Sequence, residues 1–474
     1  MERYSKFYID GRWVGPHVPS FMNVVNPATE LPFEQISLGS ADDVDLAVDA
    51  ARRAFPRYSE TSVDERIKLL TRAYEIFKRR QADFAAVITQ EIGAPISFSM
   101  EAQTTICFGH FEATIEALRQ FSWHEEFGTS RVVKEPIGVV GLITPWNWPI
   151  NQIVCKVLPA LAVGCTVVLK PSEIAPLDAT LFAEVLEEAG FAPGVFNLIN
   201  GEGSTVGEAI AAHPGIDAVS FTGSTRAGLR VAKIAADTVK RVTQELGGKS
   251  PNIILDDADL HVAVRDGVLG CFANTGQNCD APTRMLVSEK RYEEAVRIAA
   301  ETALAVQVGD PGVSTTTMGP VVSAVQYRRI QEYIQKGIDE GAKLVVGGTG
   351  KPLGLETGYF VKPTVFASVS NSMTIAREEI FGPVLCILSY RDEEDAISIA
   401  NDSVYGLAAY VESGDIEHAR RVAARLRAGS VFINYPAWDA KVPFGGYKQS
   451  GNGRESGLHG MNEYLELKSI VGYG

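Results

Sequence analysis

The chain has few of the residues that mark secreted, zinc-binding or disulfide-rich proteins. Six cysteines occur among 474 residues, and no two of them form a Cys-x-x-Cys pair. Cysteines spread so thinly indicate reduced thiols and a cytoplasmic protein rather than a disulfide framework. The seven histidines include no His-Glu-x-x-His motif, so we expect no metal site.

Positive charge and long apolar runs are also scarce. The 44 Lys and Arg residues are outnumbered by 58 Asp and Glu, for a net charge of −14, which argues against a nucleic-acid partner. The longest apolar run, 157–169, is too short for a bilayer and contains Pro159, and residues 1–7 have no apolar signal core. We therefore expect no membrane partner and a location in the cytoplasm.

The first half of the chain predicts an α/β unit. Two amphipathic helical patterns, 42–55 and 64–92, come first, and Ser40 and Asp43 are spaced as a capping box before the first of them. Short apolar segments then alternate with helical patterns, which indicates a parallel sheet covered on both faces and a Rossmann-like nucleotide-binding layout. The expected strands are 139–144, 166–169, 195–199, 218–221 and 241–244.

A second α/β series follows residue 252 and meets the first near Gly247 and Gly248. Its expected strands are 252–255, 285–287, 344–346, 384–390 and 430–433, with helical patterns between them. Two further β segments, 132–135 and 463–468, belong to neither series. Exposed strands of this kind commonly pair with another subunit.

Two residues lie in sequence surroundings that suit a catalytic pair. Cys279 ends the run Gly276-Gln277-Asn278-Cys279, whose small and amide residues would let a planar carbonyl reach a thiolate. Glu245 stands at a strand end on the glycine hinge between the two units, where a desolvated carboxylate could act as a general base. Taken singly, a cysteine such as Cys279 is more often a buried core residue, and a glutamate such as Glu245 is more often a surface residue.

The turn Thr144-Pro145-Trp146-Asn147-Trp148-Pro149 surrounds one amide with two prolines and two tryptophans. A buried Asn147 side chain must find a partner, or else stabilise charge that develops during a reaction. The alternative is that Asn147 caps the following helix.

Two segments at expected strand ends suit a dinucleotide, although no Gly-x-Gly-x-x-Gly motif is present. Gly223 and Ser224 lie between a strand and a helix, where backbone N–H groups could bind phosphate, or Ser224 could simply cap the helix. Lys170 and Glu173 follow another strand and could hold ribose hydroxyls, or they could form an ordinary solvated turn. A carboxylate at this place repels a 2′-phosphate, which favours NAD over NADP.

Taken together and in order, the motifs resemble those of the NAD(P)-dependent aldehyde dehydrogenase superfamily, and the resemblance spans essentially the whole chain. The matching runs are PWNWP, KPSE, FTGSTRAG, ELGGKSP, GQNC, EEIFGP and PFGGYKQSGNGRE. Each is weak alone, but seven in one order leave chance agreement negligible.

The resemblance implies a covalent mechanism. Cys279 would attack the aldehyde carbonyl, and the Asn147 amide with the Cys279 backbone N–H would hold the oxyanion. Glu245 would then activate the water that hydrolyses the thioester to the carboxylate. Members that pass the acyl group to coenzyme A generally lack this carboxylate, so water is the expected acceptor.

The resemblance also implies a cofactor site for NAD, with NADP as the alternative. Lys170 and Glu173 would hold the adenosine ribose, and Gly223 and Ser224 would lie by the pyrophosphate. Glu379 and Phe381 would position the nicotinamide ribose and ring. The same comparison places Trp146 and Gly203 at the cofactor.

Three parts are implied for the fold. Residues 1–120 and 141–246 would form the Rossmann-like NAD-binding domain, and 247–445 would form the α/β catalytic domain. Residues 121–140 and 446–474 would form a small β oligomerisation arm. Since dimers and tetramers are usual in the family, we expect a homodimer or homotetramer.

The substrate is expected to be an aliphatic or aromatic aldehyde of medium length. The tunnel residues implied by the resemblance are mostly apolar, and no arginine is evident among them, which disfavours a carboxylate-bearing semialdehyde. They are Trp148, Cys155, Asn278, Asp280, Trp438 and Phe444. The alternatives are a cationic, betaine-type aldehyde held by tryptophans near Asp280, a semialdehyde, and a catalytically silent relative with a structural or binding role.

Asp280 departs from the family, which usually has a small or apolar residue directly after the nucleophile. A carboxylate facing the sulfur would raise the pKa of the thiol and slow its attack. We therefore expect Asp280 to point away from Cys279, towards the outer rim of the tunnel, and to leave the titration of the thiol unchanged.

Overall fold

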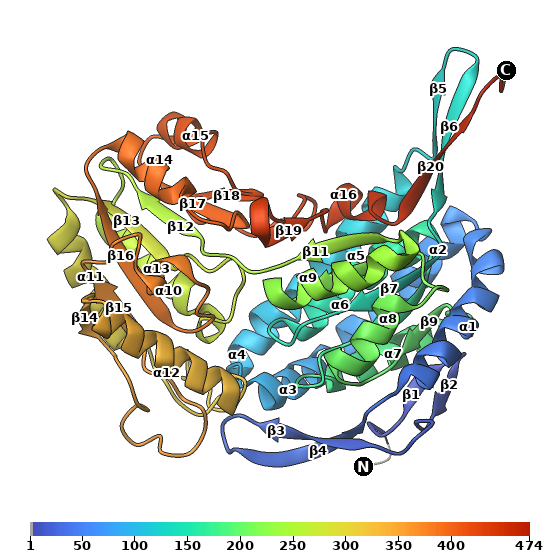
Figure 1. The fold of residues 1–474 in the computed structure, drawn as a ribbon, viewed down its shortest axis with the longest axis horizontal. Coiled ribbons are helices and arrows are strands. Elements are labelled where there is room, and N and C mark those ends of the chain that lie inside the picture. Colours follow the sequence, from blue (N-terminus) through green and yellow to red (C-terminus); the bar gives the residue numbers. More distant parts are fainter. Residues whose placement is uncertain (1–2) are drawn as a thin grey trace.

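The structure is a computed structural model that describes residues 3–474. Two α/β units lie side by side, and a narrow β arm that carries the C-terminus projects from one of them (Figure 1). Each unit is built around its own sheet, of eight and of seven strands. The predicted fold class, a Rossmann-like unit with a second α/β unit and a small β arm, is confirmed.

The first sheet has a parallel centre of five strands. Strand β7, the first of them in the sequence, lies in the middle, with β8 and β9 on one side and β10 and β11 on the other. This strand order is that of a Rossmann-like sheet, whose ligand crevice lies at the carboxyl ends between the central strands. The bounds are β7 Val139–Ile143, β8 Thr166–Lys170, β9 Phe196–Leu198, β10 Ala218–Thr222 and β11 Arg241–Glu245.

Helices cover both faces of this sheet, because alternate side chains of its strands are apolar on both sides. Val140 and Leu142 face one helical layer, whereas Val139 and Ile143 face the other. The first layer holds α2 (Val63–Arg79), α3 (Gln81–Ile92), α5 (Thr105–Arg119), α6 (Pro149–Val163) and α7 (Leu177–Ala189). The second holds α1 (Ala41–Ser59), α8 (Glu208–Ala212) and α9 (Thr225–Ala235).

The second sheet has the order β14-β15-β16-β13-β12-β17-β18, and only its edge strand β14 is antiparallel. Its bounds are β12 Pro251–Ile254, β13 Arg284–Ser288, β14 Lys343–Val346, β15 Thr364–Ala367, β16 Val384–Tyr390, β17 Ala408–Glu412 and β18 Ser430–Ile433. Helices α10 (Leu260–Phe272) and α11 (Tyr292–Ala305) cover one face. Helices α12 (Ala324–Asp339), α13 (Thr374–Arg377), α14 (Glu393–Asn401) and α15 (Ile416–Ala423) cover the other.

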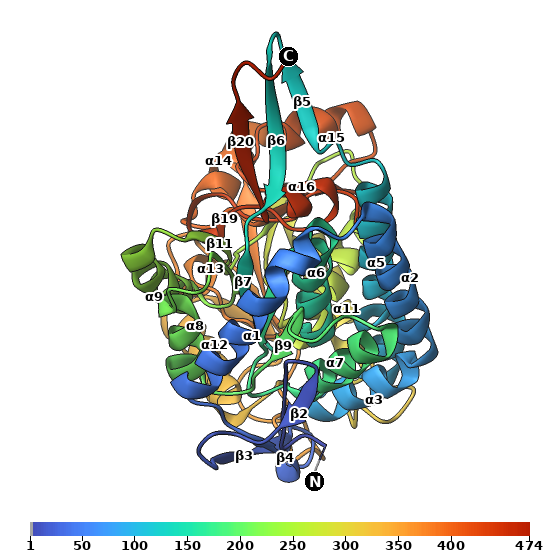
Figure 2. The same cartoon turned by 90° about the vertical axis from the view of Figure 1, so that its right-hand side faces the viewer.

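The arm is a three-stranded antiparallel sheet that stands clear of both units (Figure 2). It consists of β5 (His124–Phe127), β6 (Ser130–Pro136) and β20 (Leu465–Ile470). The two stray β segments expected from the sequence are therefore paired with each other, in β6 and β20. Within residues 3–474, no helix is both long and apolar enough to cross a lipid bilayer.

The boundaries expected for the arm are too wide. Residue 139 already begins β7, and β19 (Gly451–Asn452) pairs with β11 at the edge of the first sheet. Helix α16 (Gly457–Asn462) packs on α5 and α6. The segment before β20 lies on the first unit because Gln244 and Glu245 at the end of β11 need backbone partners, which Asn452 and Gly451 provide.

Several expected elements differ in detail. The amphipathic pattern 64–92 is two helices, because Arg80 leaves the helical conformation between α2 and α3. The helical segment between β9 and β10 begins as a π-helix over Gly203–Gly207, ahead of α8. Strands β15 and β17 were not expected, and neither were β1 (Phe7–Ile9), β2 (Arg12–Val14), β3 (Phe21–Asn26) and β4 (Leu31–Ser37). Strands β1 and β2 extend the first sheet, and β3 and β4 form a separate hairpin.

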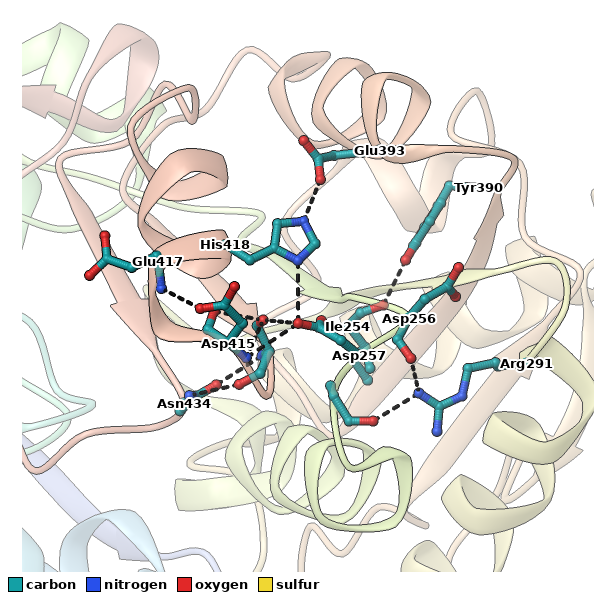
Figure 3. Close-up of polar contacts among 12 residues, drawn as sticks. Ile254, Asp256, Asp257, Arg291, Tyr390, Glu393, Asp415, Glu417, His418 and Asn434 are labelled. Carbon is teal, nitrogen blue, oxygen red and sulfur yellow. Dashed lines mark hydrogen bonds and ion pairs between the residues drawn. The ribbon is translucent and has the colours of Figure 1, made fainter.

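A polar network ties together the loops at the carboxyl edge of the second sheet (Figure 3). His418 on α15 lies 3.3 Å from Asp257 through Nδ1 and 2.5 Å from Glu393 through Nε2. Asp257 Oδ2 also accepts from Ser413 Oγ at 2.7 Å. Because both acceptors of the imidazole are carboxylates, both of its nitrogens carry protons, and His418 is an imidazolium in this network.

This network predicts a pH-dependent stability. The hydrogen bond with Glu393 and then the contact with Asp257 raise the pKa of His418 above its ordinary value. The contribution of protonated His418 to the free energy of unfolding is therefore complete below about pH 6.5. It is lost as the pH rises through the pKa of His418 in the folded protein. His418→Gln should lower Tm by about 1 °C near pH 6, because exposed pairs contribute little. The difference should vanish near pH 9 in thermal unfolding, and the exposed His459→Gln serves as the matched control.

Candidate active site

A strained loop carries Cys279. After α10 the chain enters the left-handed region at three consecutive residues, Asn274 (φ 52°), Thr275 (φ 58°) and Gly276 (φ 71°). This conformation costs about 1–2 kcal/mol for each non-glycine residue, and such strain concentrates at functional sites. A side chain at Gly276 would meet the backbone of Gly382 at 2.2 Å, so only glycine fits there.

Buried amides hold the loop in this conformation. Gln277 Oε1 accepts from Val322 N at 3.0 Å, and Gln277 Nε2 donates to Asn274 O at 3.1 Å. The Asn147 side chain joins the loop from the first unit, because its Nδ2 donates to Gln277 O at 2.9 Å. Asn147 therefore does not cap α6, whose N-cap is Trp148, and the second N–H of its amide remains for another acceptor.

The glycine hinge between the two sheets permits two close approaches. A side chain at Gly248 would meet the carbonyl oxygen of Cys279 at 2.3 Å. One at Gly247 would meet the carboxylate of Glu379 at 2.4 Å. Glu379 Oε1 in turn accepts from Gly248 N at 3.0 Å. The pair Gly247-Gly248 thus lets the Cys279 loop and the Glu379 carboxylate share one junction.

Cys279 lies between two cavities. One, of about 180 Å³, lies over the carboxyl ends of β7 and β10, and the other, of about 310 Å³, opens towards α5 and α6. Cys279 is the one described residue that lines both. Reactants that enter from opposite sides can therefore meet at its sulfur. The smaller cavity lies at the crevice where Rossmann-like sheets bind nucleotides.

The residues expected at the cofactor divide into two groups. Trp146, Gly223, Ser224, Glu379 and Phe381 line the smaller cavity. The ring of Trp146 stands edge-on to that of Phe381, with centroids 5.4 Å apart. Ser224 Oγ accepts from Ala227 N at 3.3 Å and so caps α9, but its place in the cavity wall remains. The capped N-terminus of α9 has the polarity that suits a phosphate.

The second group lies outside that cavity. Lys170, at the carboxyl end of β8, is buried and donates to Glu173 Oε2 at 2.8 Å. Gly203 begins the nearby π-helix and has open space where a side chain would stand. A pre-formed Lys170–Glu173 pair leaves a donor and an acceptor side by side, which is the arrangement that ribose hydroxyls require.

Glu245 is a buried carboxylate at the end of β11. Neither of its buried carboxylate oxygens has a hydrogen-bond partner among residues 3–474. Burial, followed by the nearby Glu455 charge, raises the pKa of Glu245 well above its ordinary value. A buried carboxylate without protein partners is one that a water molecule or a reacting group would satisfy.

All six residues expected in the tunnel line the larger cavity, namely Trp148, Cys155, Asn278, Asp280, Trp438 and Phe444. Trp148 Nε1 donates to Asn278 Oδ1 at 2.6 Å, and Asn278 Nδ2 donates to Ala273 O at 3.0 Å. The Asn278 amide therefore fixes the Trp148 ring as one rigid wall. Trp438 is 40% exposed and lies at the outer end.

Other residues of the site were missed in the sequence. Lys156 on α6 is fully buried and pairs with Glu455, which also accepts from Cys155 Sγ at 3.2 Å. A lysine within the apolar run of α6 is a signal of a buried partner of opposite charge. Glu455 lies in a matched motif but had no assigned role. The tunnel residues His110, Asn151, Gln152 and Tyr410 had no local signal.

The expectation that Asp280 leaves the thiol unperturbed is wrong. Asp280 does line the tunnel, but its charge is the largest cause after burial that raises the pKa of Cys279. Burial raises the pKa of the Asp280 carboxyl as well. Asp280 is the residue next to Cys279, and charges in a site withdrawn from water are poorly screened. Turning the Asp280 side chain away from the sulfur therefore does not remove its effect on the thiol.

Comparison with known proteins gives a consistent result. Residues 13–470 match the model of the aldehyde dehydrogenase family. The curated relatives include a 3-succinoylsemialdehyde-pyridine dehydrogenase of Pseudomonas sp., which is 55% identical over 100% of this chain and 99% of its own.

Solved structures are similar over the whole chain. Aldehyde dehydrogenase C of Pseudomonas syringae, a mutant crystallised with NAD⁺ and octanal, is 52% identical, with a TM-score of 0.99 over 100% of this chain and 97% of that one. Betaine aldehyde dehydrogenase of Staphylococcus aureus, crystallised with NAD⁺, is 38% identical, with a TM-score of 0.96 over 99% of this chain and 95% of that one.

The effect of the Asp280 charge on Cys279 predicts how the thiol titrates in a variant. Asp280→Asn removes the negative charge beside the sulfur, so the pKa of Cys279 should fall. The pH dependence of alkylation by iodoacetamide, followed on the Cys279 peptide, measures it. Asp237→Asn, an exposed site that lines neither cavity, is the matched control. An unchanged alkylation profile in Asp280→Asn would restore the original expectation.

Proposed function

The chain belongs to the aldehyde dehydrogenase family, and on this premise we propose that it oxidises a medium-length aliphatic or aromatic aldehyde to its carboxylate through a thioester on Cys279. The observation that carries this assignment is the position of Cys279 between the two cavities. The enzyme uses NAD. A catalytically silent role would leave the partnerless Glu245 carboxylate unexplained.

The first step takes place at the sulfur. The Cys279 thiol, whose pKa is raised, first loses its proton to solvent water. The thiolate then adds to the aldehyde carbonyl, and the carbonyl oxygen becomes the oxyanion of a thiohemiacetal. The free N–H of the Asn147 amide and the Cys279 backbone N–H stabilise that oxyanion. Anchoring of Asn147 to Gln277 O keeps its donor in place before substrate arrives.

The cofactor belongs in the smaller cavity. Trp146, Glu379 and Phe381 would hold the nicotinamide half, Gly223 and Ser224 the pyrophosphate, and Lys170 with Glu173 the adenosine ribose. NAD bound there would supply the hydride acceptor, and loss of the hydride from the thiohemiacetal carbon would leave a thioester on Cys279. Glu173 favours NAD because a carboxylate repels a 2′-phosphate, with NADP as the alternative.

Glu245 completes the cycle. Its carboxylate takes a proton from a water molecule, whose oxygen adds to the thioester carbonyl, and the sulfur leaves as the acid forms. A raised pKa suits a base that must hold this proton and then release it. This role makes water the acyl acceptor, so added coenzyme A should not yield a thioester product.

The relatives and the residues of the tunnel together narrow the range of candidate substrates. The octanal complex supports an aliphatic aldehyde of medium length, as do the aromatic walls of the tunnel. No Lys or Arg lines the tunnel in the part of the chain described, which disfavours a carboxylate-bearing semialdehyde. A cationic aldehyde is the second candidate, supported by Asp280 in the wall and by the betaine aldehyde dehydrogenase relative.

The assembly we propose is a homodimer or homotetramer that uses the arm. Strand β20 is an edge strand, and exposed apolar side chains stand on the arm at Leu467 (67% exposed) and Phe127 (59% exposed). Such an edge pairs readily with another chain. All six cysteines are free thiols, which fits the reducing cytoplasm where we place the protein.

Replacement of the base should separate the two half-reactions. In Glu245→Gln, NADH should appear as a rapid burst of about one equivalent per active site, since acylation does not need the carboxylate. Turnover after the burst should slow by about 100-fold or more. Stopped-flow absorbance of NADH measures both phases.

Two controls define this experiment. Glu289→Gln makes the same change at an exposed site and should leave both phases as in the wild type. Cys279→Ala should give no burst. A steady-state rate in Glu245→Gln equal to that of the wild type would show that another group activates the water.

The arm predicts the assembly state. Leu467→Glu puts a charge on β20 and should shift the protein to a smaller species in light scattering after size-exclusion chromatography. Leu353→Glu, at a fully exposed site away from the arm, should leave the mass unchanged. A wild-type protein that is monomeric at micromolar concentration would refute the proposed assembly.

A further inference from the structure

The chain leaves β18 in a strained conformation. Asn434 and Tyr435, the two residues that follow the strand, both lie in the left-handed region, with φ of 55° and 44°. For a bulky aromatic residue such as Tyr435 this conformation is a genuine outlier. Backbone strain of this kind persists only where the surrounding structure holds it, and it concentrates at functional sites.

Tyr435 contributes its ring, and not its hydroxyl, to the substrate tunnel. Tyr435 lines the larger cavity together with Tyr410 and Phe432. Its hydroxyl is buried, has no hydrogen-bond partner within residues 3–474, and lies towards α10, where a side chain at Gly267 would meet it at 3.5 Å. The apolar body of the side chain is therefore the part that forms the tunnel wall.

The Tyr435 ring is packed on two sides. It stacks on the ring of Tyr410, with centroids 5.2 Å apart and an interplanar angle of 24°. On the side of α10 it lies against Gly270, where an added Cβ would meet Tyr435 Cε1 at 3.3 Å. The Tyr410 hydroxyl in turn donates to Asp280 O at 3.2 Å, so this wall is continuous with the residue after Cys279.

The Asn434 side chain holds the strained turn. Its Oδ1 accepts from Ser413 N at 3.0 Å, and its Nδ2 donates to Ser413 O at 3.0 Å. The backbone N–H of Asn434 donates to Val411 O at 3.1 Å. Both polar groups of one amide therefore bind the backbone of one residue, and asparagine tolerates the left-handed conformation better than most residues.

Ser413 is itself anchored. Its Oγ donates to Asp257 Oδ2 at 2.7 Å and accepts from Asp415 N at 3.1 Å. Asp257 belongs to the polar network around His418 at the carboxyl edge of the second sheet, and Asn434 lies at the margin of that network (Figure 3). The network thus gives Asn434 a fixed backbone partner.

Asn434 does not reach the aldehyde itself. It is exposed, and it lines neither of the two cavities that meet at Cys279. Any effect of Asn434 on the choice of substrate therefore acts through its neighbour Tyr435, whose backbone it holds.

We propose that Asn434 is a positioning residue that locks the Tyr435 ring in the tunnel wall and so sets the width of the tunnel. This inference rests on the proposed oxidation of aldehydes at Cys279 and adds a determinant of substrate shape to it. With the ring locked, the enzyme favours slender, unbranched aldehydes over branched ones of the same composition.

Two isomeric aldehydes test the proposal with NAD. Nonanal is slender and 3,5,5-trimethylhexanal is broad, and both have nine carbons, so their kcat/KM ratio reports shape alone. Asn434→Ala should lower the preference for nonanal by about three- to tenfold, mainly because KM for the branched isomer falls as the wall loosens.

Further variants show whether Asn434 acts through Tyr435. Tyr435→Ala should lower the preference as well, and the double variant should lower it no further, because both changes remove the same wall. Tyr435→Phe keeps the ring and should lack this effect. Gly270→Ala should push the ring into the tunnel and raise the preference. Asn462→Ala, at an exposed site on α16, is the matched control for Asn434→Ala.

The outcomes separate this inference from the function on which it rests. A wild-type ratio in Asn434→Ala overturns the inference, and so do additive effects in the double variant. Equal loss of kcat/KM for both isomers overturns it too, since Asn434 would then only support folding. If Asn434→Ala does not fold, Asn434→Asp, which keeps the acceptor for Ser413 N, should still lower the ratio, and an unchanged ratio there is equally decisive. A wild type that reduces NAD with neither isomer refutes the proposed function itself.

Discussion

Withdrawal of ionisable groups from water, at the junction of the two sheets, is the constraint on which the site depends. Cys279, Glu245, Glu379 and Asp280 all meet there, and burial is the largest cause of the raised pKa of each. For Glu379 that pKa is raised to about 7. At Cys279 the charges of Asp280, Glu379 and Glu245 add to the effect of burial and raise the pKa of the thiol further.

Close packing makes this arrangement feasible. The Cys279 loop reaches the junction only because Gly248 and Gly276 leave room for backbone against backbone. The strain of the left-handed residues 274–276 is offset by the amides of Asn274, Asn147 and Gln277, which leave little freedom to the loop. The site is thus built before substrate arrives, so its donors need no reorganisation as charge develops.

The sequence predicted the frame of the fold because parallel strands buried on both faces leave a periodic apolar signal, as in β7, β8 and β10. It did not predict β15 and β17, although both are buried. It joined α2 to α3 because arginine, which stands between them at position 80, is not a helix-breaking residue. The arm boundary was misplaced since β19 pairs through its backbone, which leaves no side-chain pattern. Among the residues of the candidate site, those in contiguous motifs were predicted, whereas His110, Asn151 and Gln152 line the tunnel only because α5 packs on α6.

The central claim is that aldehyde and NAD meet at the sulfur of Cys279. Rapid quenching of the enzyme with octanal and NAD, followed by mass mapping of its peptides, tests that claim most directly. The account predicts an acyl group on the Cys279 peptide alone, present only when both reactants are added and absent from the peptide of Cys155 in the same tunnel. An acyl group on Cys155, or NADH formed while the Cys279 peptide stays unmodified at every quench time, would contradict it.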